Sequence, residues 1–253
     1  MVAAYGCLQN RKIALATLWI VVATYIKPYG AIGFCMILFY PGQLKFILYS
    51  LLWTVLLGAL PLLVIPMQTL VWEYKNWGYL IKEDAAAAVG ISVAGWLHTW
   101  FGINNSKFYV TVIGILLFLV PFVRFRHYRN EQFKLLTLAS MLIWVIIFNH
   151  KAESSTYIIA VTGVAIWYFA APKAKWRTAL LFFVLLFTCF STTDIFPPYV
   201  RKHFIYPYTI KAFPCILAWC AVIYDLMTMN ISAKIRTGVE EDIPVKGMPT
   251  ARL

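Results

Sequence analysis

Charged side chains are scarce in this sequence, and acidic ones are the scarcest. Asp and Glu number 10 and Lys and Arg 22, so only 13% of the 253 residues are charged, against about 25% in soluble domains. Apolar residues make up 62% and aromatic residues 17%. A soluble chain of this length could not keep so much apolar surface from water, whereas a lipid bilayer solvates it. The composition indicates an integral membrane protein and argues against a soluble globular domain.

Several motifs that carry common chemistries are missing as well. The zinc-protease motif HExxH, a Gly-rich phosphate loop and an internal repeat are all absent, and so are the paired aspartates or Ser–His arrangement of an intramembrane protease. The cysteines form no CxxC pair or other metal-ligand spacing; they are Cys7, Cys35, Cys189, Cys215 and Cys220. We interpret them as small packing residues and expect no cofactor and no metal site.

Long runs without charge predict the membrane segments. They show no strand-type alternation, and a lone helix satisfies its own backbone in lipid, so we expect helices. The sequence predicts an all-α fold, a polytopic transmembrane helical bundle of about eight membrane helices, with short interfacial helices in the long outer loop. The predicted spans are residues 13–26, 29–40, 45–66, 108–123, 135–149, 156–171, 178–193 and 209–229.

The distribution of basic residues predicts the orientation. With eight spans, 14 of the 22 basic residues face the inside, chiefly in the short loops Arg124–Lys134 and Pro172–Arg177, as the positive-inside rule requires. A single kinked span through Lys27-Pro28 is the alternative, but it would place Arg11 and Lys12 outside. We therefore favour eight spans in one transmembrane domain, residues 1–230, followed by a polar, disordered cytoplasmic tail, residues 231–253. No cleavable signal peptide is evident.

Ionisable residues on the predicted outer side are the candidates for chemistry. The run Asn149–Glu153 places His150, Lys151 and Glu153 between two short apolar segments. A polar run at membrane depth is costly unless it has partners, so it is a functional candidate. The alternative is a short exposed loop with solvated charges. Lys27, between Tyr25 and Tyr29, could bind an anionic head group or extend to the interface.

Two further outer segments suit the membrane surface. Asp194 opens a stretch rich in Pro and Tyr that ends in Arg201 and Lys202, a composition that fits lipid phosphates or a plain interfacial anchor. The loop Met67–Lys107 carries four tryptophans. They predict helices lying in the interface plane, although aromatic platforms also stack on sugar rings.

Five segments follow one another along the chain: Ile26–Gly30, Phe39–Pro41, Gly90–Trp96, Phe148–Ser154 and Thr193–Pro197. In this order they resemble the C-terminal half of glycosyltransferase family 87, in versions close to those of the Bacteroidetes. These are GT-C type membrane enzymes, and the resemblance covers roughly residues 10–229.

The resemblance implies a hexosyl- or mannosyltransferase of the bacterial inner (plasma) membrane. Its donor would be a polyprenyl-phosphate-linked sugar and its acceptor a glycan or glycolipid; membrane lipid is the other partner, and nucleic acid is not one. Lys27, His150 and Lys151 would hold the donor phosphate, and Glu153 would orient that pair or a sugar hydroxyl. Arg201 and Lys202 would steer the anionic lipid. Asp194 completes the set of substrate-binding candidates.

One family feature has no counterpart here. Family members carry a catalytic aspartate in an outer loop near their first helix, and no acidic residue precedes Glu73 in this chain. We therefore expect a truncated member whose catalytic residue is unknown and whose partners include a separate N-terminal half. A transporter or flippase of lipid-linked sugars, or a non-catalytic membrane subunit, are the alternatives.

Overall fold

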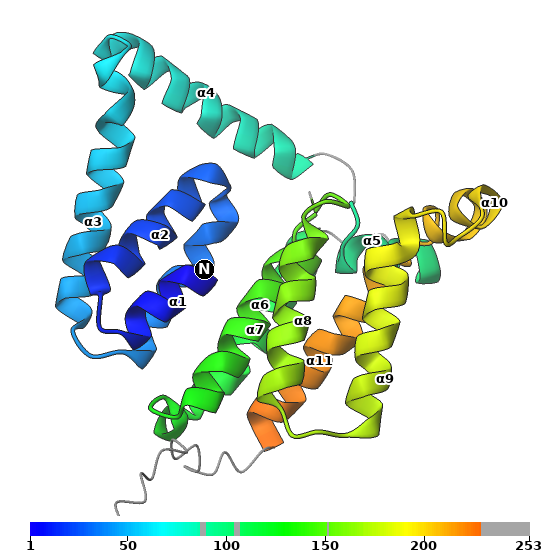
Figure 1. Ribbon diagram of the computed structural model, residues 1–253. Coiled ribbons are helices and arrows are strands. Elements are labelled where there is room, and N and C mark those ends of the chain that lie inside the picture. The colour runs from blue at the N-terminus through cyan, green and yellow to red at the C-terminus, as the bar shows by residue number, and fades with distance from the viewer. Residues whose placement is uncertain (87–89, 104–106, 151, 229–253) are drawn as a thin grey trace, which may run out of the picture.

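The computed structural model describes residues 1–86, 90–103, 107–150 and 152–228 of the chain (Figure 1). Within these residues the fold is helical without strands, which confirms the predicted all-α class. The first half contains α1 (Val2–Gln9), α2 (Ile13–Ile26), the 3-10 helix η1 (Pro28–Phe39), α3 (Gln43–Ala59), η2 (Leu60–Leu63), α4 (Met67–Ala86) and α5 (Val93–Phe101). The second contains α6 (Lys107–Leu119), η3 (Val120–Val123), η4 (Phe125–His127), α7 (Glu131–Ile147), α8 (Tyr157–Ala170), α9 (Lys175–Val184), η5 (Leu185–Cys189), η6 (Phe190–Thr192), α10 (Pro198–Val200), η7 (Arg201–Ile205) and α11 (Phe213–Thr228).

Helix α7 is the centre of the C-terminal bundle, where it packs against α8 and α11 while α9 lies beside α8 and α11 (Figure 1). Its first turn is fixed by Asn130, whose side-chain oxygen accepts hydrogen bonds from the backbone N–H groups of Gln132 and Phe133. Gly163 lets α8 approach closely, because a Cβ there would lie 2.8 Å from the carbonyl oxygen of Ala139. This close packing buries α7 along most of its length.

A buried ion pair joins three helices of the bundle. Arg177, at the start of α9, donates from Nη2 to Oδ1 of Asp225 in α11 at 2.5 Å, and Trp167 of α8 donates from Nε1 to Oδ2 of the same carboxylate at 2.7 Å. Asp225 is fully buried, and Arg177 is nearly so. The carboxylate is satisfied on both oxygens, which offsets the cost of burying it.

The N-terminal helices form a second group. Helix α2 ends at Ile26, Lys27 is extended, and η1 begins at Pro28 and packs back along α2. A Cβ at Gly30 would lie 2.4 Å from the backbone nitrogen of Thr24, so only glycine allows this antiparallel approach. The chain thus turns at Lys27-Pro28, in agreement with two separate segments and not one kinked helix.

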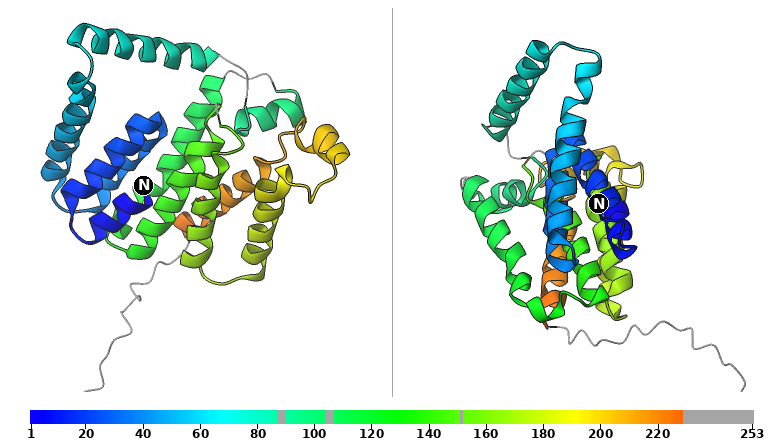
Figure 2. Two further views of the ribbon diagram at one scale, coloured as in Figure 1. Left: turned by 45° about the horizontal axis from the view of Figure 1, so that its top comes forward. Right: turned by 90° about the vertical axis from the view of Figure 1, so that its left-hand side faces the viewer.

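Helix α3 exposes nearly its whole surface, since Phe46 is its one buried residue. Together with η2 it forms a 21-residue helix, Gln43–Leu63, with a mean hydropathy of 2.1. This segment and Lys175–Thr192, with 18 residues and a mean hydropathy of 1.3, are the two helices of the described residues that are long and apolar enough to cross a membrane. Helix α4 runs across the end of α3, and it stands away from the bundle in the right-hand view of Figure 2.

The loops predicted to face opposite sides of a membrane lie at opposite ends of the structure. The loops before α7 and before α9 are at the lower end of Figure 1, whereas α4 and the loop between α7 and α8 are at the upper end. Each of the eight predicted spans coincides with a helical segment. A crossing of the membrane by all eight remains a prediction, and the predicted tail, 231–253, lies outside the described residues.

Candidate functional site

An apolar cavity of about 460 Å³ lies between the N-terminal helices and the bundle. Its walls come from the start of α1, the junction of α2 and η1, and the inner parts of α7 and α8. Lys27 contributes the one charged side chain among its lining residues. The other residues that line it are Met1, Val2, Ala3, Ala23, Ile26, Tyr29, Gly30, Leu142, Val145, Ile159 and Thr162.

The turn at the end of α2 places Lys27 in this cavity. Pro28 lacks a backbone N–H group, so α2 cannot continue through it, and proline disfavours helical backbone at the residue before it. Lys27 therefore adopts an extended conformation, with φ −147° and ψ 133°. Its ammonium lies 5.8 Å from the centre of the Tyr29 ring, at the rim of a wall that is otherwise apolar.

The predicted cluster around His150 lies in the loop between α7 and α8. The His150 carbonyl oxygen accepts a hydrogen bond of 2.9 Å from the N–H group of Gly90. A Cβ at position 90 would lie 2.4 Å from that oxygen, so this contact requires glycine. Glu153 is exposed and accepts a hydrogen bond from Ser155. Lys151 lies outside the described residues. Neither His150 nor Glu153 lines the cavity that holds Lys27.

The structure brings Asp194 and Arg201 together. Arg201 Nη1 lies 3.2 Å from Oδ1 of Asp194 and also donates to the carbonyl oxygen of Thr192. Because Asp194 is fully exposed, such a pair contributes little to stability, but it neutralises the arginine proposed to attract an anionic lipid. Lys202 is exposed. None of the three residues lines the Lys27 cavity.

The structure adds Lys211, which was not among the predicted site residues. Lys211 is buried and donates from Nζ to Ser154 Oγ at 2.6 Å, and its ammonium lies 5.9 Å from the ring centre of Tyr157. Among the described residues no carboxylate pairs with it. A buried ammonium held only by a hydroxyl and a ring is costly to retain, so Lys211 is a candidate for holding an anion.

A sequence signal for Lys211 existed. It is the one basic residue between His203 and Lys234, directly before an apolar helix. Two residues earlier, Thr209 adopts φ 53°, a left-handed conformation that is a true outlier for a β-branched residue. Only the tertiary contact with Ser154, 57 positions away, distinguishes this lysine from an ordinary interfacial one.

The tryptophans of the long outer loop fall into two sets. Trp96 stacks on Phe213 at 5.5 Å between ring centres, and Trp100 lies 5.2 Å from the same ring. These two therefore pack against the bundle. Trp72 and Trp77 on α4 are 60% and 41% exposed, which suits a membrane interface and leaves their ring faces free.

No group of three His, Cys, Asp or Glu side chains within the described ranges could hold a metal ion. No protein-family model, curated protein or solved structure matches this chain. The two candidate sites described above are cationic and apolar: Lys27 lines an apolar cavity, and Lys211 is buried beside Ser154 and Tyr157.

Proposed function

We propose that this protein is a multi-pass membrane protein that binds a polyprenyl-phosphate-linked sugar and acts in hexosyl transfer at the outer face of the bacterial inner membrane. The observation that supports this most is the apolar cavity with Lys27 at its rim. A lipid phosphate needs an apolar wall for its chain and a cation for its head, and this cavity supplies both.

The physical terms of such binding favour a long-chain phosphate over a small anion. Each buried methylene contributes about 0.8 kcal/mol, so the apolar wall would supply most of the affinity. Lysine is a compact charge that binds phosphate without a fixed orientation. Lys27 would then fix the position of the lipid phosphate relative to the apolar wall of the cavity.

In sugar transfer, an acceptor hydroxyl would attack the anomeric carbon, and the bond from that carbon to the phosphate oxygen would break. The polyprenyl phosphate leaves with an additional negative charge, which cations near it stabilise. Lys27 is the proposed partner of this phosphate in the cavity. His150 and Lys151, which the resemblance implies, and the buried Lys211 are further proposed partners, although neither His150 nor Lys211 lines the Lys27 cavity. Glu153 would orient a sugar hydroxyl.

A non-catalytic, donor-binding subunit is the second candidate. It is favoured by the absence of any carboxylate from the lining of the cavity, since the hydroxyl of the acceptor must lose its proton to a base. In that case a separate N-terminal half would supply the aspartate. A flippase would instead carry ionisable groups along the membrane midplane.

Donor binding is tested by titrating the purified protein, in detergent, with a polyprenyl-phosphate mannose. Loss of a hydrogen bond to a charged group corresponds to roughly a tenfold loss of affinity or more, so Lys27→Gln should weaken binding by about that factor. Lys45→Gln is the matched control, because Lys45 is an exposed lysine that does not line the cavity. Equal affinities of both variants would contradict the proposed site.

Release of free polyprenyl phosphate distinguishes the two candidates. The same donor, labelled in its polyprenyl chain, is incubated with the protein and with bacterial membranes as a source of acceptor. An enzyme releases polyprenyl phosphate in proportion to protein, and Lys27→Gln slows the release. A binding subunit shows the Lys27-dependent affinity without release.

A further inference from the structure

A second cavity, of about 400 Å³, lies at the opposite ends of the helices that line the first one. The start of the chain, Met1–Ala3, lines the first cavity, whereas Leu8 and Gln9 at the end of α1 line the second. On α7, Leu142 and Val145 line the first cavity, and Glu131 and Lys134 line the second. Where the first cavity is apolar, the second is lined mainly by side chains that can bind a polar ligand. We propose that it binds the phosphate group of an anionic lipid or of a small phosphate ester.

Most of the polar lining is held by Glu131. Its carboxylate accepts hydrogen bonds from Lys134 Nζ at 2.8 Å, from Tyr5 and from Gln9. The Lys134 ammonium also lies 4.6 Å from the centre of the Tyr40 ring. These contacts fix the donors of Lys134 and Gln9 at the cavity wall, so the wall is pre-organised and not assembled from freely moving side chains.

Two groups that line this cavity, the Tyr40 hydroxyl and the Arg11 guanidinium, could still donate hydrogen bonds to a ligand. The Tyr40 hydroxyl is buried near the Tyr5 hydroxyl and the Glu131 carboxylate, but it makes no hydrogen bond of good geometry in the described part of the chain. A buried hydroxyl that is poorly paired is costly. Arg11 also lines the cavity; it is exposed, and its guanidinium makes no ion pair or hydrogen bond among the described residues. A phosphate can accept hydrogen bonds from both groups, and the arginine fork matches phosphate oxygens in pairs.

The backbone of Arg11 supplies an independent argument. Helix α1 ends in a Schellman motif, with Lys12 N donating to Cys7 O at 2.8 Å and Arg11 N to Leu8 O at 3.0 Å. Arg11 is the residue with φ 56°, a position at which glycine is usual. An arginine in a left-handed conformation where glycine would relieve the strain is a backbone outlier, from which we infer a role for its side chain.

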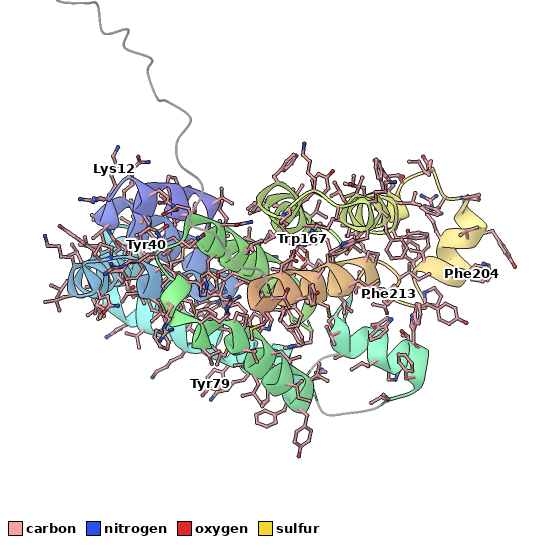
Figure 3. All side chains as sticks on the ribbon, turned by 90° about the horizontal axis from the view of Figure 1, so that it is seen from below. Lys12, Tyr40, Tyr79, Trp167, Phe204 and Phe213 are labelled. Atoms are coloured by element: carbon pink, nitrogen blue, oxygen red, sulfur yellow. The ribbon has the colours of Figure 1, made fainter. Side chains whose placement is uncertain are left out.

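The location suits a phosphate on a lipid. The cavity lies at the end where the basic loops gather, and basic pockets between membrane helices on the cytoplasmic side bind anionic head groups. Figure 3 views the molecule from this end: Tyr40 lies between the N-terminal helices and α7, whereas Lys12 lies at the outer edge. Lys12 carries the same charge as its neighbour Arg11 but does not line the cavity.

The test compares the full chain with three variants, in two arms. In the lipid arm, nanodiscs contain phosphatidylcholine with or without phosphatidylglycerol, and native mass spectrometry counts retained phosphatidylglycerol. In the solute arm, the protein in neutral detergent is titrated with glycerol 3-phosphate. Arg11→Gln should weaken binding about tenfold, and Lys12→Gln, which removes the same charge, by less than about twofold. Retention in the first arm alone assigns a lipid, and binding in the second a free phosphate ester.

Arg11→Gly separates a structural role from a binding role. Relief of the left-handed strain should raise the melting temperature by about 2–4 °C, while removal of the guanidinium should weaken phosphate binding as Arg11→Gln does. A rise in stability with unchanged binding would overturn the proposal. So would equal effects of Arg11→Gln and Lys12→Gln, or no binding of either probe by the unmodified chain. Each of these outcomes is independent of the Lys27 cavity.

Discussion

Helices α3 and α7 have the same length and a similar apolar content, yet they are buried to opposite extents. Of 17 residues each, α7 buries 13 and α3 buries one. Helix α7 is covered by protein on all sides. Helix α3 packs against α2 on one side, and its remaining surface presents exposed Leu, Val and Tyr side chains. An apolar face of that size marks a surface that contacts a membrane or another protein. The difference separates a helix held by side-chain packing from one that the membrane prediction places in lipid.

The largest effect is expected where the C-terminal bundle depends on its buried ion pair. Asp225→Ala leaves the Arg177 guanidinium buried without its carboxylate, which should lower the free energy of unfolding by about 3–5 kcal/mol. Unfolding in mixed micelles measures it. The double variant Arg177→Met, Asp225→Leu removes both charges and should recover most of the loss. If Asp225→Ala lowered the free energy of unfolding by no more than the loss of an exposed ion pair does, the bundle would not depend on this contact.

Helix α3 should respond to a charge as a lipid-facing helix does. Leu51 lies near the middle of Gln43–Leu63 and is 59% exposed. Lysine at the centre of a membrane helix costs about 2.5–3.5 kcal/mol on insertion scales, so Leu51→Lys should reduce the fraction that resists alkaline extraction from membranes. Leu63→Lys, at the helix end, should extend to the interface and cost less. If both variants behaved like the unmodified chain, α3 would face water.

The close contact of α7 with α8 should be sensitive to a single methyl group. Gly163→Ala forces its Cβ to within 2.8 Å of the Ala139 carbonyl oxygen, which should cost about 1–3 kcal/mol in the free energy of unfolding. Gly78→Ala on α4 meets nothing within 4 Å and should be neutral or stabilising by up to about 1 kcal/mol. Chemical unfolding of both variants in detergent tests this contrast, and equal effects would contradict it.

The smallest effect is expected at Glu131, on the rim of the second cavity. Burial alone would raise the pKa of its carboxyl, but hydrogen bonds from Lys134 and Gln9 and the charge of Lys134 outweigh burial and lower it. A lowered folded-state pKa contributes stability above the unfolded pKa, near 4.5, and this contribution is lost as the pH falls through the folded value. Thermal unfolding between pH 6 and about 3 should therefore show a loss of stability that is smaller in Glu131→Gln than in the unmodified chain.

Much of the helical pattern could be predicted from the sequence, because proline and charge delimit it locally. Pro28 ends α2 where predicted, whereas α7 begins at Glu131, four residues before the predicted span 135–149. The contacts that shape the sites could not be predicted, because they join distant positions. Lys211 meets Ser154 57 residues away, and Arg177 meets Asp225 48 residues away. No local pattern reveals which acid a buried base will meet.

The predicted site residues show the same contrast between local effects, which the sequence reveals, and long-range contacts, which it does not. The position of Lys27 follows from the local effect of Pro28, whereas the cavity around it needs α1, α7 and α8 to converge. His150 and Glu153 were selected for their neighbours in sequence, but their contacts in the structure are with Gly90 and Ser155. The left-handed conformation of Arg11 has no sequence signal, since glycine is the residue expected there.

Photocrosslinking with a polyprenyl phosphate that carries a diazirine in its chain tests the central claim most directly. Mass spectrometry of the crosslinked peptides would locate the chain on this protein. A lipid bound in the cavity predicts adducts on Ile26, Leu142, Val145 and Ile159, in competition with unlabelled polyprenyl phosphate and reduced by Lys27→Gln. Adducts spread over the exposed face of α3, unchanged by competitor or by Lys27→Gln, would show that the chain meets this lipid only as solvent.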